Sequence, residues 1–386
     1  MDIYIYSNED VKFLNNNVYV NTINIHMKIK NFKIFKNYRN RVNKINCIFN
    51  KLNSFEGINF EKVNELNCFN NNITSFNSLE IPINNLNCGF NKIISFEGLK
   101  FPINELICFH NLIQNFEGLK IPIKFLNCNN NQITSFKGLN NYKIFNGFKL
   151  KIDTLHCNFN QLNSFKELNI NINNLDCSYN QIRNFKDLKV KINNLNCSNN
   201  LIHSFEGLKI RIYHLNCSNN LIENFKGLKV KINELICPYN LIENFEELKI
   251  KINHLYCAFN KITSFEGLNF PINYLDCSHN QITSFKGINI KIIELICSYN
   301  LIENFEGLKV KIDYLDCSFN QITSFKGINI KMIGLICSYN LIENFEELKV
   351  PINILYCTNN QITSFEGLKF PINYLDCSNN EIENFE

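Results

Sequence analysis

The residues with the greatest capacity for chemistry are 17 cysteines, which recur at a nearly constant spacing. They stand at positions 47, 68, 88, 108 and 128 and then at every twentieth residue from 157 to 377. Thiolates bind metals, but zinc requires four ligands around one point, and the sequence contains no CxxC pair. On parallel strands about 4.8 Å apart, neighbouring cysteine Cβ atoms lie farther apart than the ~3.8 Å typical of disulfides. An odd number of thiols also cannot all pair.

Burial in a core is the better interpretation of these cysteines. Cysteine is among the most frequently buried residue types and packs as a small apolar side chain. An asparagine follows three residues after each cysteine, from Asn50 to Asn380. A buried amide can bond to backbone groups of neighbouring coils, so we expect a structural role for it as well. We therefore expect reduced, packed thiols with no metal ion and no cofactor.

The other chemistry-bearing residues form no catalytic or metal-binding motif. The seven histidines occupy unrelated positions within the repeat: His26, His110, His156, His203, His214, His254 and His279. No nucleophile elbow, glycine-rich phosphate loop or paired-carboxylate motif occurs. The sequence therefore predicts no catalytic residue, and we expect a protein that is not an enzyme.

Variable residues beside the cysteines are better candidates for function. Side chains alternate between the two faces of a strand, so residues one and three positions before each cysteine point outward. In the C-terminal half these include His254, Tyr256, Tyr274, Asp276, Tyr314, Asp316, Tyr356, Tyr374 and Asp376. Rows of tyrosine, aspartate and small polar residues resemble the composition of antibody binding surfaces. We predict a protein-binding patch over residues 254–376, and an ordinary hydrated sheet surface is the alternative.

Basic residues also occur in pairs two positions apart, and in an extended segment the members of each pair share a face. The pairs are Lys189 and Lys191, Lys209 and Arg211, Lys229 and Lys231, Lys249 and Lys251, and Lys309 and Lys311. Such a stripe could meet phosphate groups, but asparagine or proline interrupts it and glutamates lie nearby. A net charge of +4 on 386 residues is too weak for a nucleic-acid or membrane footprint. A solvated edge is therefore favoured over a weak polyanion-binding surface.

The elements that position these residues follow from a repeat of 20 residues with the form IxxLxCxxNxIxxFxxL. In one coil, Leu195 and Cys197 share the inner face of a strand, and Asn200 turns the chain out of it. Ile202 and Phe205 then carry the return path and fill the middle of the coil. One coil cannot bury its own apolar side, so the coils must stack around a continuous core.

This pattern resembles the leucine-rich-repeat family, LxxLxLxxNxL, with cysteine in place of the third leucine, from about Val42 to Glu386. The period resembles that of the short repeat class of bacterial effector proteins. The resemblance implies an α/β-class solenoid, a horseshoe of about 17 coils with a parallel β-sheet on the concave face. It also implies extended or turn segments with little helix on the convex face. Proline six residues before the cysteine, as at Pro271, and glycine ten residues after it, as at Gly207, agree.

The richness in asparagine and lysine also resembles repeat proteins of amoebae and of the giant viruses that infect them. Only four of the 39 basic residues are arginine, and the sequence has no tryptophan. These biases favour codons rich in A and T. Much of the asparagine and lysine excess is therefore explained without selection for a ligand.

Three places depart from the repeat. Residues 1–41 lack it, and an alternating run over 18–29 predicts a strand within an N-terminal cap. Cys128 and Cys157 lie 29 residues apart, which predicts a nine-residue insertion near 140–149 that bulges from the return side. The chain ends at Glu386, nine residues after Cys377, and we expect this uncapped edge to pair with a partner or a second copy.

The N-terminus has neither the basic nor the apolar segment of a signal peptide, and no run approaches 18 apolar residues. With reduced cysteines, this predicts a cytoplasmic protein. We expect a non-catalytic protein–protein interaction scaffold that binds a protein partner on the concave sheet face. The alternative is a structural or self-assembling repeat protein that associates through its C-terminal edge.

Overall fold

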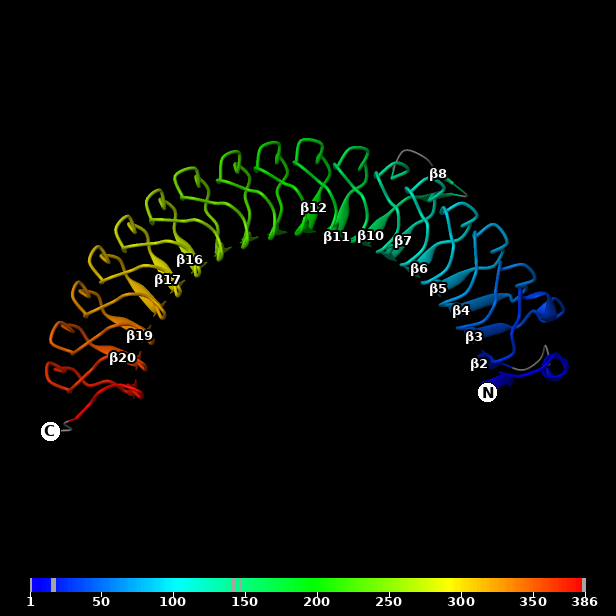
Figure 1. Cartoon of the computed structure of the whole chain (residues 1–386). Coiled ribbons are helices and arrows are strands. Elements are labelled where there is room, and N and C mark those ends of the chain that lie inside the picture. Colours follow the sequence, from blue (N-terminus) through cyan, green and yellow to red (C-terminus); the bar gives the residue numbers. More distant parts are fainter. Residues whose placement is uncertain (1, 15–18, 140–143, 146, 384–386) are drawn as a thin grey trace. The chain divides into compact units, whose positions relative to one another are not determined.

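The computed structural model describes residues 2–14, 19–139, 144–145 and 147–383, and the chain divides into two compact units, Met1–Cys197 and Ser198–Glu386. In each unit the chain winds into stacked coils, with strands along one side of the stack and turns along the other (Figure 1). Each unit is therefore a solenoid built from one strand per coil.

In the unit Met1–Cys197, each sheet strand pairs in parallel with the strand of the next coil. These strands are β1 (Asp2–Ile5), β2 (Val20–Ile25), β3 (Arg41–Asn46), β4 (Lys62–Asn67), β5 (Ile83–Asn87), β6 (Ile103–Ile107), β7 (Ile123–Asn127), β10 (Ile152–His156), β11 (Ile172–Asp176) and β12 (Ile192–Asn196). Two short 3-10 helices, η1 (Asp10–Phe13) and η2 (Lys33–Phe35), lie between the first strands.

The unit Ser198–Glu386 repeats the same arrangement. Its strands are β13 (His214–Asn216), β14 (Glu234–Ile236), β15 (His254–Tyr256), β16 (Ile272–Asp276), β17 (Ile292–Ile296), β18 (Ile312–Asp316), β19 (Met332–Ile336), β20 (Ile352–Tyr356) and β21 (Tyr374–Asp376). The register joins equivalent positions of the repeat, so that Leu255 lies beside Leu275. Every position of the repeat therefore becomes a row of side chains along the stack.

The expected parallel solenoid with little helix is confirmed. Among the described residues the two 3-10 helices are the only helical segments, and the return side consists of bends and turns. None of the helices found in the described part is long and apolar enough to cross a membrane.

The apolar positions of the repeat fill the interior of the stack. Phe285 stacks between Phe265 and Phe305, with ring centroids 6.1 and 5.7 Å away. Cys277 is fully buried, and its sulfur donates to the carbonyl oxygen of Ile296 in the next coil at 3.4 Å. All the cysteines are free thiols and all but Cys377 are buried, which confirms that they pack in the core.

The N-terminal segment contributes strands to the same sheet. β2 covers Val20–Ile25, within the strand expected over 18–29, and Ile23 of this strand lies in register with Ile45 of β3. Residues 15–18 lie outside the described part of the chain. That this segment acts as a cap stays a prediction.

The insertion near 140–149 is partly described. β8 (Ile144–Phe145) and β9 (Phe148–Lys149) pair antiparallel as a short hairpin, with Gly147 between them at a φ of 77°. Residues 140–143 and 146 lie outside the described residues.

The asparagine of each coil bonds to the coil before it. In one coil, Asn300 Nδ2 donates to the carbonyl oxygens of Cys277 and Cys297, each at 3.0 Å. Its Oδ1 accepts from the amide of Ile282 at 2.9 Å. The same bonds recur at Asn71, Asn111, Asn240 and Asn360, among others. The structural role expected for the asparagines is confirmed.

Two positions of the repeat adopt left-handed backbone conformations that close the turns. The residue before each asparagine has a positive φ, 53° at Tyr299, although it is not glycine. Gly287, ten residues after its cysteine, has a φ of 94°, and a Cβ there would lie 2.6 Å from the backbone nitrogen of Glu266. This confirms the tight bend expected from the repeated glycines.

Replacing Asn300 with alanine should destabilise the protein strongly. The change leaves the buried amide of Ile282 and the carbonyl of Cys277 without the side chain that bonds to them. An unsatisfied buried group costs about 1–3 kcal/mol, so we expect a loss of about 2–4 kcal/mol in the free energy of unfolding, measured in urea. Asn353 is exposed, and its replacement with alanine should change stability by less than about 0.5 kcal/mol. Equal losses for the two variants would contradict a coil-joining role for Asn300.

The thiols should be inert in the folded protein. Burial raises the pKa of the Cys277 thiol well above its usual value, and the thiolate is the reactive form. We expect iodoacetamide to modify only the half-buried Cys377 in native protein and all 17 cysteines in denaturant. In Cys377→Ser the fast native reaction should disappear. Modification of many thiols before unfolding, counted by mass spectrometry, would show that the cysteines are not core residues.

Candidate functional site

The sequence-predicted candidates lie on the solvent side of the sheet in the unit Ser198–Glu386. We call the residues three positions before each cysteine the first row and those one position before it the second row. From β15 to β21 the first row reads His254, Tyr274, Glu294, Tyr314, Gly334, Ile354 and Tyr374. The second row reads Tyr256, Asp276, Ile296, Asp316, Ile336, Tyr356 and Asp376. The structure thus places all nine candidates in two adjacent rows.

Five of the six aromatic candidates gather in two clusters. The ring centroid of Tyr274 lies 5.0 Å from that of Tyr256 and 6.4 Å from that of His254. Tyr356 and Tyr374 form the second cluster, with centroids 5.2 Å apart. From β15 to β21 the rows cross six strand spacings, roughly 29 Å. Ile296 and Ile336 interrupt the second row between the clusters, so the predicted patch is not one continuous aromatic surface.

A pocket lies between the two clusters, over β17 to β20. It encloses about 270 Å³ and is lined in part by Ile296, Ile336, Ile354, Tyr314 and Tyr356. Two carboxylates, Glu294 and Asp316, complete the lining. The pocket therefore combines apolar walls, two aromatic rings and two negative charges.

Gly334 makes room for the pocket. A Cβ atom at this position would lie 2.8 Å from Cδ1 of Tyr314, so the tyrosine ring leans over the glycine backbone. Sequence reasoning selected tyrosines and aspartates and missed Gly334, Glu294 and the isoleucines. The available signal was that these residues occupy the same outward positions of the repeat.

The aspartates of the second row hold the turn that follows each strand. Asp316 Oδ1 accepts from the amide and the hydroxyl of Ser318, at 2.9 and 2.5 Å. Asp276 holds Ser278 in the same way, at 3.0 and 2.7 Å. Asn216 makes the equivalent bonds to its own serine at 3.0 and 2.6 Å, so the turn does not require a negative charge.

The face is electrostatically negative around Tyr274. Burial, together with the smaller effects of the Asp276 and Glu294 carboxylates, raises the pKa of the Tyr274 phenol to about 12. Burial also raises the pKa of Tyr256, with added contributions from Glu234, Asp276 and Glu294. Among the described residues, no basic side chain forms an ion pair with Asp276, Glu294 or Asp316.

No protein-family profile and no curated protein matches the sequence. Solved structures do resemble the fold. A leucine-rich repeat protein from Bacteroides thetaiotaomicron matches with a TM-score of 0.57 at 14% identity, over 93% of this chain and 52% of that one. A chain of the Toll–Spätzle complex from Drosophila matches with a TM-score of 0.53 at 15% identity, over 94% and 65%. YopM from Yersinia enterocolitica matches with a TM-score of 0.49 at 16% identity, over 95% and 85%.

The chain has the leucine-rich-repeat fold. At these identities the likeness concerns the fold alone, and the chain spans about half of the Bacteroides protein. Any function must therefore be inferred from the side chains that this leucine-rich repeat displays.

A ladder of exposed aromatic rings, which sequence reasoning missed, runs beside the sheet face. Its members, two positions after successive cysteines, are Tyr239, Phe259, His279, Tyr299, Phe319 and Tyr339. Successive centroids lie 4.0–4.4 Å apart with interplanar angles of 8–10°. Each ring belongs to the residue with positive φ, and stacking worth about 0.5–1.5 kcal/mol per pair offsets part of that strain. The four inner rings expose only their edges, so no ligand can stack on their faces.

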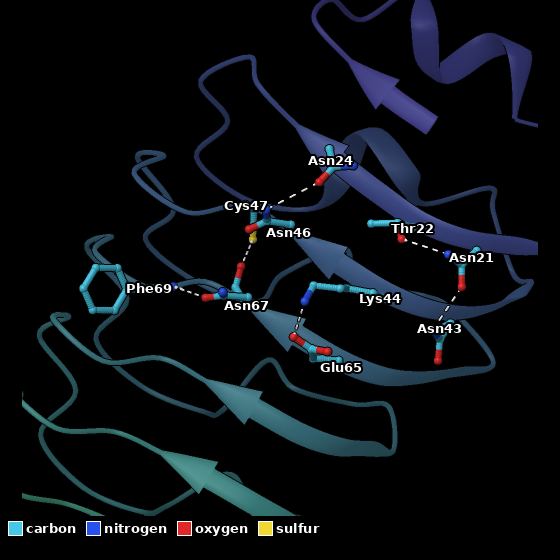
Figure 2. A network of polar contacts seen from close by, with 10 residues as sticks. All are labelled: Asn21, Thr22, Asn24, Asn43, Lys44, Asn46, Cys47, Glu65, Asn67 and Phe69. Atoms are coloured by element: carbon cyan, nitrogen blue, oxygen red, sulfur yellow. Dashed lines mark hydrogen bonds and ion pairs between the residues drawn. The ribbon is translucent and has the colours of Figure 1, made fainter. Parts of the chain in front are cut away.

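On the sheet of the unit Met1–Cys197, several polar side chains bond to one another (Figure 2). Asn43 Nδ2 donates to Oδ1 of Asn21 at 3.1 Å. In the first row, Lys44 Nζ lies 2.6 Å from Oε1 of Glu65, its neighbour in register. The ion pair between Lys44 and Glu65 is thus formed within the leucine-rich repeat itself, whereas Glu294 and Asp316 at the pocket form no ion pair among the described residues.

The basic pairs on the return side also have acidic neighbours. Lys249 Nζ lies 3.7 Å from Glu247 Oε2, and Lys311 Nζ lies 3.2 Å from Asp313 Oδ1. These contacts weaken the positive stripe and agree with its interpretation as a solvated edge.

The ionisation of Tyr274 provides a test of this geometry. We expect Tyr274 to remain mostly neutral at pH 11, where an unperturbed tyrosine is mostly ionised. The measurement is NMR of protein labelled with ¹³C at the tyrosine ring, with the signal assigned by Tyr274→Phe. Because folding raises this pKa, the associated stability is fully present below about pH 10 and is lost as the pH rises toward 12.

Glu294→Gln should lower the midpoint of this titration, because it removes one of the charges that disfavour the phenolate. A midpoint near pH 10 in the native protein would contradict the crowded, acidic surroundings described for Tyr274.

Proposed function

We infer that this chain is a non-catalytic scaffold that binds a protein partner on the sheet face of the unit Ser198–Glu386. The observation that carries this function is the pocket over β17 to β20 with aromatic clusters on both sides. Tyrosine-rich surfaces with an apolar centre and a polar rim are typical of protein interfaces.

The rigidity of the sheet supports this function. Parallel hydrogen bonds hold the backbone on both sides of each strand from β16 to β20, so only side-chain torsions remain to be fixed on binding. Tyr314 and Tyr374 are 44% and 51% exposed, so a partner could remove a large apolar area from water. Tyrosine contributes such area at a low cost in conformational entropy.

The comparison with Toll provides independent support. Toll shares the fold and forms a complex with Spätzle, according to the description of that structure. Leucine-rich-repeat neighbours therefore suggest a protein-interaction scaffold for this chain. Self-association through the C-terminal edge stays a prediction.

Replacing Tyr274, Tyr314 and Tyr374 together with alanine should abolish partner capture. The variant removes one aromatic ring from each cluster and the ring over Gly334. We expect at least a tenfold loss of the captured partner, because interface tyrosines are frequent hot spots. The measurement is affinity purification followed by quantitative mass spectrometry. The unchanged protein and the variant are each expressed in the organism that makes this chain.

The control replaces Tyr6, Tyr19 and Tyr213 with alanine, which lie outside the patch and are 66%, 63% and 50% exposed. This control should capture the partner as well as the unchanged protein does, and both variants should keep the native melting temperature. If the variant that lacks Tyr274, Tyr314 and Tyr374 still captured the partner fully, the sheet face would not be the binding site.

A further inference from the structure

We propose that the pocket over Gly334 receives an arginine side chain from a basic segment of the partner. This inference rests on the proposed function and adds the chemistry of the partner to it. It follows from the shape of the pocket, from the charges beside it and from the spacing of the second row.

The size and walls of the pocket fit one side chain. The pocket volume of about 270 Å³ lies just below the range of small-molecule sites, which span roughly 300–1,000 Å³. Ile296, Ile336 and Ile354 offer apolar walls to the methylene groups of a long side chain. Ile336 is 38% exposed, so this apolar area is open to solvent and available for burial.

The negative charges beside the pocket favour a cation within it. Glu294 and Asp316 line the pocket, and among the described residues no lysine or arginine forms an ion pair with either carboxylate. Lys311, directly before β18, pairs with Asp313 instead, with Nζ 3.2 Å from Oδ1. An anionic side chain would be repelled, and a neutral apolar one would desolvate both carboxylates without bonding to them.

Arginine fits this combination better than lysine. Its planar guanidinium can stack on a tyrosine ring and donate to a carboxylate in the same position. Tyr314 and Tyr356 supply the rings, and Glu294 and Asp316 supply acceptors on the same pocket. The aliphatic stem of arginine covers apolar surface while its charged end stays near water.

The second row extends the preference for basic side chains to neighbouring residues of the partner. Asp276 and Asp316 lie two strands apart, about 9.6 Å at ordinary strand spacing. Tyr356 lies two further strands along the same row. In the polyproline II conformation three residues make one turn of about 9.3 Å, which brings every third side chain to the same face, so basic residues at every third position match this row.

The test uses a fluorescent peptide made of three copies of Arg-Gly-Gly and measures binding by anisotropy with the full-length chain. We expect saturable binding that is at least tenfold tighter than that of the Lys-Gly-Gly and Met-Gly-Gly peptides. The corresponding Glu-Gly-Gly peptide should show no binding. Equal or tighter binding of the methionine peptide would overturn the choice of a basic partner.

Two variants of the protein separate charge from shape. Asp276→Asn, Glu294→Gln and Asp316→Asn together remove the charges, and Asn216 shows that asparagine holds the following serine equally well. Gly334→Ile fills the pocket with the residue type that stands at the equivalent position of the next coil, Ile354. Each variant should bind the arginine peptide at least tenfold more weakly than the unchanged protein does, and each should keep the native melting temperature.

A matched control changes the same number of charges away from the sheet face. Glu223→Gln, Glu303→Gln and Glu343→Gln alter exposed residues six positions after their cysteines. This variant should bind the peptide within about twofold of the unchanged protein at physiological ionic strength, because exposed charges are screened beyond about 8 Å. An equal loss in this control would show binding by net charge alone and would overturn the pocket.

The result also separates the two proposals. If no peptide binds but the tyrosine variant still loses the cellular partner, the basic-partner inference is wrong and the sheet-face function stands. If the tyrosine variant retains the cellular partner, the proposed function fails whatever the peptides do. If the arginine peptide binds Gly334→Ile as tightly as it binds the unchanged protein, the pocket is also excluded as the arginine site.

Discussion

The hydrogen bonds of one buried asparagine per coil determine much of this structure. In the coil of Asn300, the side chain bonds to carbonyl oxygens of its own coil and of the coil before, and it accepts an amide from that preceding coil. These hydrogen bonds join neighbouring coils, as the parallel strand pairs do. The turn and the sheet therefore enforce the same register between coils. A slip by one residue would break both sets and turn the apolar row outward. Within each unit, equivalent residues therefore lie beside one another in every coil.

This register turns repetition in the sequence into continuous rows, and the rows explain the chemistry of the surface. Rows of identical apolar residues are favourable, as in the phenylalanine stack around Phe285. Rows of identical charges would repel, and the second row avoids this because Ile296 separates Asp276 from Asp316. The carboxylates then lie about 9.6 Å apart instead of about 4.8 Å. The same alternation places Ile296 and Ile336 on either side of Asp316, which is how apolar walls and a negative charge come to share one pocket.

Much of the fold could be predicted from the sequence because it depends on local spacing. The positions of Cys277 and Asn300 in the repeat were sufficient to predict burial, a strand and a turn, and the structure has all three. The pocket could not be predicted in this way, because it arises where Gly334 lacks a side chain and Tyr314 leans across the gap. The bond from Ser318 to Asp316 was also missed, since alternation indicates the face of a residue but not its partner. The outward direction of the nine candidates was predictable, and the division of five aromatic candidates into two clusters was not.

The scaffold is the same in both units, so the side chains on the sheet distinguish one face from the other. Both units use parallel strands and the same asparagine bonds, and on the face of Met1–Cys197 several polar side chains bond to one another. Asn194 donates to Asn174 at 2.6 Å, and Lys44 neutralises Glu65. A partner that docked there would have to break bonds already made, which offsets those it could form. Around the pocket, Glu294 has no basic neighbour in register, because Tyr274 and Tyr314 flank it. Hydrogen bonds formed there by a basic partner would add to those of the folded protein instead of replacing them.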